Sequence, residues 1–110
     1  MSLSAISKKS EFKKIVSDCK IPVFVKFFAT WCGPCKMMTP VLERVSEDFD
    51  GHVKFLEVDV DNCENLSEDY FVSSVPTFII FKNGDEFNRI SGACTYEQLE
   101  SFVKSATAVV

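Results

Sequence analysis

The sequence predicts an α/β protein with a mixed central sheet of four or five strands, flanked by helices on both faces. Two apolar runs, residues 23–29 and 53–60, have the length of buried strands, and a segment with helical apolar spacing lies between them. Because such a crossover joins parallel strands, we expect these two strands to be parallel. Two further strands, residues 77–81 and 86–90, flank Asn83-Gly84, which is a strong signal for an antiparallel hairpin.

Helices account for the other periodic segments. We expect them over residues 8–19, from Cys32 onward, over residues 63–70 and after Thr95. Their buried positions are expected to be Phe12, Ile15, Val16, Cys19, Met38, Val41, Leu42, Val45, Phe49, Leu99, Phe102, Val103 and Ala106. Pro40 should kink the second helix because it removes a backbone hydrogen bond, and Thr95 with Gln98 forms a capping box for the last. A short strand near residues 3–6 would be the fifth.

Composition limits the classes of function. The 110 residues suit a single domain, residues 1–110, and 46% of them are apolar, including 11 Phe, which indicates one dense aromatic core. The net charge is −4 and the basic residues are scattered, so we expect no nucleic-acid partner. No run approaches the roughly 18 apolar residues of a membrane span, so we expect no membrane partner either. We expect a monomer.

The segment Trp31-Cys32-Gly33-Pro34-Cys35-Lys36 carries the chemistry. Two cysteines follow a predicted buried strand and open a helix, which is the arrangement of a dithiol–disulfide redox site. Cys32 should be the attacking nucleophile, because unpaired backbone N–H groups at a helix N-terminus favour a thiolate. Cys35, one turn further along and deeper, should resolve the mixed disulfide with the substrate. Gly33 allows close backbone approach and Pro34 stiffens the turn.

Nearly the whole chain resembles the thioredoxin family. Besides the cysteine segment, the matching landmarks are Phe27-Phe28-Ala29-Thr30, Pro40, Val75-Pro76-Thr77-Phe78, Lys82-Asn83-Gly84 and Gly92-Ala93. The resemblance implies a thioredoxin fold and a protein disulfide reductase whose redox group is a Cys32–Cys35 disulfide, with no bound cofactor. It implies thioredoxin reductase and oxidised proteins as partners, with NADPH acting only through the reductase, and an influence of Pro34 on the redox potential.

The resemblance also implies a substrate groove. Pro76 is expected to follow a cis peptide bond, and the backbone of Val75 to pair with the substrate as a strand would. Gly92-Ala93 should line the opposite side, although an ordinary turn is the alternative for Gly92. Trp31 should be an exposed aromatic flank of the site, with an ordinary core position as its alternative.

Lys26 departs from the family pattern, since thioredoxins usually carry a buried aspartate at this point of the strand. A buried ammonium needs a partner or must lose its proton. Glu57, which interrupts the second apolar run, is the candidate partner, and we expect a reversed charged pair beneath Cys35. Either Glu57 or a neutral Lys26 amine would accept the Cys35 proton. The alternative is that Lys26 extends to the surface and has little catalytic effect.

Three cysteines lie outside the motif. Cys19 completes an apolar helix stripe, whereas Cys63 and Cys94 are candidates for a regulatory or intermolecular disulfide, with inert thiols as the alternative. One Cys-x-x-Cys and a single histidine do not make a zinc site, so we expect no metal. The odd number of cysteines, and ten N-terminal residues without an apolar signal core, lead us to expect the cytosol.

Two other functions remain open from the residues. One is a non-enzymatic binding or regulatory module whose affinity depends on the redox state of Cys32 and Cys35. The other is an oxidase or isomerase, although such relatives more often carry histidine where this chain has Pro34.

Overall fold

The computed structural model describes residues 3–107, so both ends of the predicted domain lie outside the described residues. The elements follow in the order β1 (Leu3–Ile6), α1 (Lys9–Asp18), β2 (Val23–Phe28), α2 (Gly33–Met37), α3 (Thr39–Asp48), β3 (Lys54–Asp59), α4 (Glu64–Asp69), β4 (Thr77–Lys82), β5 (Asp85–Ser91) and α5 (Tyr96–Thr107). The five strands form one sheet in the order β1-β3-β2-β4-β5. β3 pairs in parallel with β1 and β2, and β4 is antiparallel to β2 and β5, which confirms the predicted mixed sheet.

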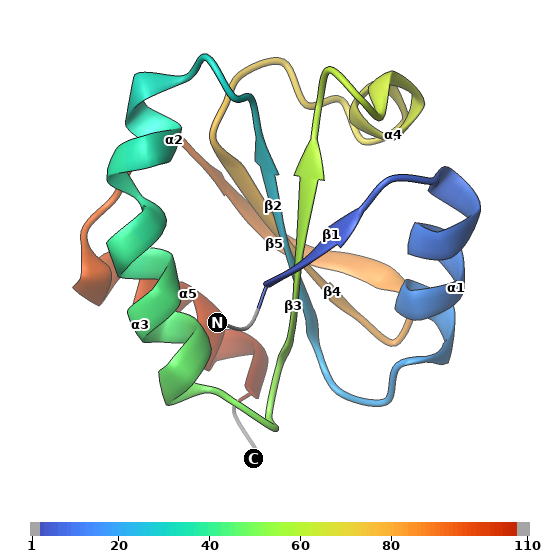
Figure 1. The fold of residues 1–110 in the computed structure, drawn as a ribbon. Helices are drawn as coiled ribbons and strands as arrows, with labels where there is room; N and C mark the ends of the chain where they lie inside the picture. Colours follow the sequence, from blue (N-terminus) through green and yellow to red (C-terminus); the bar gives the residue numbers. More distant parts are fainter. Residues whose placement is uncertain (1–2, 108–110) are drawn as a thin grey trace.

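Helices cover both faces of the sheet: α2, α3 and α5 on one side, and α1 and α4 on the other (Figure 1). Each side has its own apolar cluster, because successive strand residues point to opposite faces. Val25 and Phe27 pack with the α1–α4 side, whereas Phe24 packs with Leu42 and Leu99 on the α3–α5 side. β2 is buried on both faces, which explains its nearly continuous apolar sequence.

The long helix predicted after Cys32 is divided in two. α2 ends at Met37 and α3 begins at Thr39, with Pro40 in the first turn of α3. Pro40 has no N–H to donate, and its ring would collide with the preceding turn of a continuous helix. The helix therefore ends before Pro40 and a new one begins, instead of one helix bending at Pro40. The predicted kink is therefore a helix boundary at Met38. Val41 and Phe49 of the predicted stripe are only partly buried.

Two local predictions are confirmed in detail. Asn83 and Gly84 both have positive φ, 56° and 86°, as the central residues of a type I′ hairpin turn require. Thr95 and Gln98 form the capping box, since the Thr95 amide donates to Gln98 Oε1 (2.9 Å) and the Gln98 amide donates to Thr95 Oγ1 (3.1 Å).

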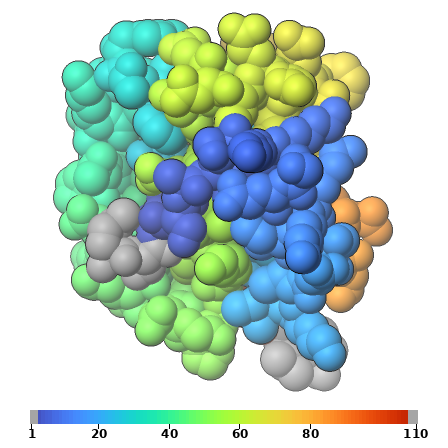
Figure 2. All heavy atoms as spheres, turned by 45° about the vertical axis from the view of Figure 1, so that its right-hand side comes forward, coloured from blue at the N-terminus to red at the C-terminus, as the bar shows by residue number. Residues whose placement is uncertain are grey.

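The parallel strands β2 and β3 end at the same edge of the sheet, and this edge positions the site. Figure 2 shows the start of α2 (cyan) meeting the α4 region (yellow-green) at that end of the molecule, with α1 (blue) below. Within residues 3–107, no helix combines the length and apolar character needed to cross a membrane.

Candidate active site

The redox pair lies where the chain leaves β2 and turns into α2. The Cys32 amide donates to the Ala29 carbonyl (3.2 Å), which tightens the turn, and Cys32 then serves as the N-cap of α2. Pro34 occupies the first turn of the helix, where its missing N–H costs nothing and its fixed φ suits the helix. This sequence therefore places a cysteine sulfur at the first backbone amides of a helix.

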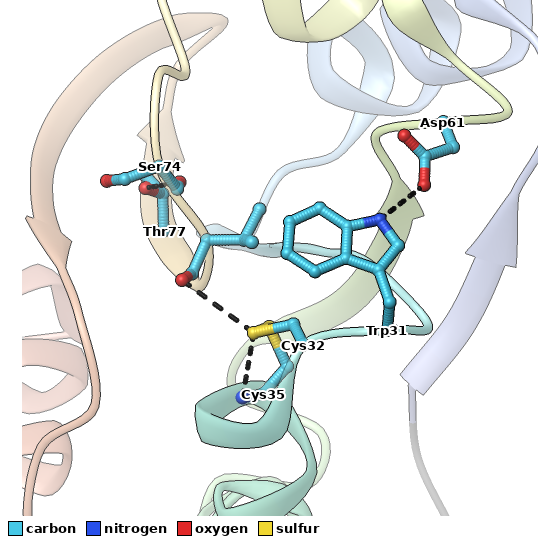
Figure 3. The surroundings of a disulfide bond; sticks show 7 residues. Trp31, Cys32, Cys35, Asp61, Ser74 and Thr77 are labelled. Carbon is cyan, nitrogen blue, oxygen red and sulfur yellow. Dashed lines mark hydrogen bonds between the residues drawn. A yellow bond between two sulfur atoms is a disulfide. The ribbon is translucent and has the colours of Figure 1, made fainter.

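Cys32 and Cys35 form a disulfide, with their Cα atoms 5.2 Å apart. The Cys35 amide also donates to Cys32 Sγ (3.1 Å), as Figure 3 shows. Cys35 was expected to lie deeper, but the exposed fractions are 3% for Cys32 and 2% for Cys35. Depth therefore does not distinguish the two sulfurs in the oxidised form, whereas the helix-capping position does.

The loop before β4 faces the disulfide. The Val75–Pro76 peptide bond is cis, as expected. The Val75 carbonyl oxygen lies 3.7 Å from Cys32 Sγ (Figure 3), near enough to accept a hydrogen bond from a reduced Cys32 thiol. The Gly92 amide donates to the Pro76 carbonyl (2.8 Å), so Gly92-Ala93 borders the cis-proline loop. Gly92 has φ +92°, a conformation that favours glycine.

Trp31 is 70% exposed beside the disulfide, so the expected aromatic flank is correct and the core alternative is not. Its indole N–H donates to Asp61 Oδ2 (2.9 Å) across the top of the site (Figure 3). The Asp61 amide in turn donates to Asp59 Oδ1 (2.9 Å). Sequence reasoning missed Asp61 as the partner of Trp31, because no local pattern links residues so far apart in the chain.

Lys26 remains buried, with 8% of its surface exposed, and pairs with Glu57 in the register of β2 and β3. Burial lowers the pKa of the Lys26 ammonium, and the smaller effect of the Glu57 charge raises it. The two residues are therefore neighbours in register, as the expected pair requires, but the ion pairs found within residues 3–107 do not join their side chains. The Lys26 ammonium instead lies 4.7 Å from the centre of the Phe28 ring.

Two cavities adjoin Lys26. The larger, about 290 Å³, is lined by Lys26, Phe28, Ala29, Thr30, Cys35, Lys36 and Thr39. The smaller, about 30 Å³, is lined by Leu3, Lys26, Thr39, Leu42, Glu43 and Glu57, and could hold a single water. Lys26 and Thr39 line both, so they lie between Cys35 and Glu57. Thr39 and Glu43 carry no sequence signal that would have singled them out.

The thioredoxin family model matches residues 4–105. This chain belongs to the thioredoxin family. The thioredoxin of Rickettsia felis is 44% identical over 77 residues, which cover 70% of this chain and 73% of that protein. The thioredoxin of Porphyra purpurea is 36% identical over 101 residues, covering 92% and 94% of the two chains. Chloroplastic thioredoxin M4 of Arabidopsis thaliana is 40% identical over 95 residues, which are 86% of this chain and 49% of that protein.

Solved thioredoxin structures agree with the fold. The thioredoxin of Malassezia sympodialis superimposes with a TM-score of 0.88 at 35% identity, covering 97% of this chain and 92% of that one. The oxidised thioredoxin of Plasmodium falciparum gives 0.86 at 34% identity, covering 97% and 100%. With its Cys32–Cys35 disulfide, this thioredoxin family member is a protein disulfide reductase, and the non-enzymatic alternative is not favoured.

Outside the redox pair, Cys19, Cys63 and Cys94 are free thiols. Cys63 is 4% exposed and its thiol donates to the Ile6 carbonyl (3.6 Å). Burial, and then the Asp59 and Glu11 charges, raise the pKa of Cys63. Burial also raises the pKa of Cys94, which is partly buried. Both shifts disfavour the reactive thiolate, so a regulatory role for either residue remains only a sequence prediction.

Proposed function

We propose that this disulfide reductase attacks its substrates through Cys32 and resolves the mixed disulfide through Cys35. Support comes from the N-cap position of Cys32 and from the Cys35 amide, which points at Cys32 Sγ at 3.1 Å. A backbone N–H directed at a sulfur stabilises the thiolate, and the thiolate is the nucleophilic form. Pro34, in the first helical turn, holds this arrangement and would tune the redox potential.

The exchange proceeds in two displacements. The Cys32 thiolate attacks one sulfur of the substrate disulfide, a Cys32–substrate bond forms, and the other substrate sulfur leaves as a thiolate that takes a proton. The Cys35 thiolate then attacks Cys32 Sγ, and the second substrate sulfur leaves in the same way. The substrate gains two electrons and the protein ends with the Cys32–Cys35 disulfide. A thioredoxin reductase, itself drawing on NADPH, would return the two electrons.

The substrate would bind along the cis-proline loop. Pro76 has no N–H, and the backbone of Val75 beside Cys32 Sγ is placed to pair with an extended substrate strand. Gly92-Ala93 would form the opposite wall, since Gly92 is bonded to Pro76. Trp31, exposed and anchored by Asp61, would pack on the bound polypeptide.

Lys26 is the group best placed to receive the proton of Cys35. Both residues line the cavity of about 290 Å³, whereas Glu57 faces the smaller cavity on the other side of Lys26. Burial disfavours the charged form of Lys26, which increases the share of neutral amine able to take a proton. Glu57 would act through Lys26 as a positioning residue.

The two cysteine roles can be tested with insulin as substrate, using a thioredoxin reductase and NADPH. The wild-type protein should turn over, Cys32→Ser should form no mixed disulfide, and Cys35→Ser should accumulate one through Cys32. Capture of substrate by Cys32→Ser at the wild-type rate would reverse the assignment.

The cytosol and a monomeric state are further parts of the proposal. The free thiols of Cys19, Cys63 and Cys94 suit a reducing compartment. Some relatives are named as chloroplastic. Fluorescence imaging of the tagged protein in its own cell tests the compartment, and a signal confined to an organelle would contradict the cytosol. Sedimentation at several concentrations tests the monomer.

A further inference from the structure

A cavity apart from the disulfide adjoins the loop that carries Gly92-Ala93. It lies between the end of β5 and α5 and has a volume of about 690 Å³. Ile90, Ser91, Ala93 and Cys94 line one side, and Glu97, Gln98 and Ser101 line the other. This volume lies within the range of roughly 300–1,000 Å³ that is usual for ligand sites. The proposed reaction uses none of the three α5 residues.

The cavity continues the substrate groove. Cys32 Sγ lies 3.7 Å from the Val75 carbonyl oxygen, the next residue is Pro76, and the Pro76 carbonyl accepts the Gly92 amide. Ala93, the neighbour of Gly92, already lines the cavity. A polypeptide held between the cis-proline loop and Gly92-Ala93 would therefore pass directly over the cavity.

The charge of the cavity points to one kind of side chain. Glu97 is exposed, and the hydrogen bonds and ion pairs found in the described chain do not engage its carboxylate. Arg89, the basic residue of β5, is paired with Glu86 through two 2.6 Å hydrogen bonds and makes no ion pair with Glu97. The Ser101 hydroxyl adds an uncharged hydrogen-bonding group, whereas the Ser91 hydroxyl lies 3.3 Å from Thr77 Oγ1 and is already engaged there. An unneutralised carboxylate beside neutral polar groups complements a cationic side chain.

We propose that this cavity is a specificity subsite that receives a lysine or arginine side chain of the polypeptide substrate, near the cysteine captured by Cys32. Glu97 supplies the opposite charge, and the hydroxyl of Ser101 adds hydrogen-bonding capacity. The subsite rests on the proposed groove along Val75-Pro76 and Gly92-Ala93, because only a substrate bound there would place a flanking residue over the cavity.

Symmetrical peptide disulfides test the subsite. Each peptide carries one cysteine, with lysine or glutamate at one position between one and six residues away on either side. The reduced protein is mixed with each peptide and the second-order rate constant for peptide reduction is measured by chromatography. At one or more positions the lysine peptide should react about two- to fivefold faster than the glutamate peptide, and added salt should shrink the difference.

Three variants assign the preference to the cavity. Glu97→Gln should bring the lysine-to-glutamate rate ratio close to one, and Glu97→Lys should invert it. Ser101→Lys should also lower the ratio, since it adds a positive charge to the cavity and leaves Glu97 in place. Glu47→Gln, which removes an exposed carboxylate near the far end of α3, should keep the wild-type ratio.

Equal rates for lysine and glutamate peptides at every position, or a ratio unchanged in both Glu97→Gln and Ser101→Lys, would overturn the subsite while leaving the proposed groove intact. Failure of the wild-type protein to reduce any of the peptides would instead refute the groove and the subsite together. A second copy of the chain in the cavity would appear as a sedimentation coefficient that rises with concentration and falls in Ser101→Lys, and would also overturn the proposal.

Discussion

Lys26 and Glu57 lie opposite each other on the parallel strands β2 and β3, but the ion pairs of the described chain do not join their charged groups. Between them lies a cavity of about 30 Å³, large enough for one water. On its other side, Lys26 lines the cavity that reaches Cys35. The buried ammonium is thus close to the redox pair and only loosely neutralised, which leads to two predictions.

Replacing Lys26 should slow the second displacement more than the first. Lys26→Met keeps an unbranched apolar side chain one atom shorter and removes the proton acceptor, so release of the second substrate thiol should slow by about 10²-fold, the lower end of general-base effects. Glu57→Gln should slow it less, because Glu57 acts only through Lys26. Rapid-quench analysis of the mixed disulfide separates the steps, and an unchanged second step in Lys26→Met would dismiss the proton-acceptor role.

Lys26 should also make stability depend on pH. Its pKa in the folded protein is below the usual 10.5, so between the two values the unfolded chain binds more protons, and stability rises with pH through that window. Lys26→Met lacks this rise and should be more stable than wild type at neutral pH, because it no longer buries a charge. Urea unfolding of both proteins at several pH values should show this difference shrinking as the pH approaches 10.5. A constant difference would mean that the Lys26 pKa is not lowered.

Asp61 should hold the orientation of Trp31. Asp61→Ala removes the indole acceptor, so Trp31 should move more freely, and its fluorescence anisotropy should fall. The chain has a single Trp, so the signal reports this residue alone. Because both side chains are exposed, the loss of stability should be about 1 kcal/mol or less, whereas insulin reduction should slow several-fold. Glu64→Ala, an exposed carboxylate on α4, serves as the control and should change neither readout.

The cysteines of the reduced protein should differ in reactivity. Cys32 should be alkylated first by iodoacetamide near neutral pH, and Cys63 and Cys94 at least about tenfold more slowly, because burial raises the pKa of both thiols. Mass spectrometry of digests taken over time gives the order in which the cysteines are alkylated. In urea, where the chain is unfolded, the differences in alkylation rate should disappear. If Cys63 or Cys94 kept pace with Cys32 in the native protein, the regulatory prediction for that residue would gain support.

Backbone conformation should decide the effect of glycine substitutions. An added Cβ meets no atom within 4 Å at either Gly84 or Gly33, but only Gly84 has a positive φ, +86°. Gly84→Ala should therefore cost about 1–2 kcal/mol of unfolding free energy, measured in urea, through backbone strain alone. Gly33→Ala, in the first turn of α2, should cost nothing or stabilise slightly. Equal losses at the two sites would argue against strain as the cause.

Much of the fold could be predicted from local sequence patterns. The apolar composition and length of the runs determine the strands, Asn83-Gly84 determines the hairpin turn, and Thr95 with Gln98 determines the start of α5. The redox pair Cys32 and Cys35 could be predicted from the spacing of the two cysteines and their position after a buried strand. These features depend on groups within a few residues of one another, where bond geometry and steric limits leave few conformations.

Tertiary packing decided the rest of the site. The sequence contains no sign that Trp31 would bond to Asp61 or that Gly92 would bond to Pro76. It placed Lys26 beneath Cys35, but neither the cavity between them nor the missing ion pair to Glu57 could be read from it. It also suggested different depths for the two sulfurs, which the packed site buries alike. Contacts between distant segments depend on how whole elements settle against one another. Displacements of an ångström or two, which no local pattern records, decide whether two polar groups meet.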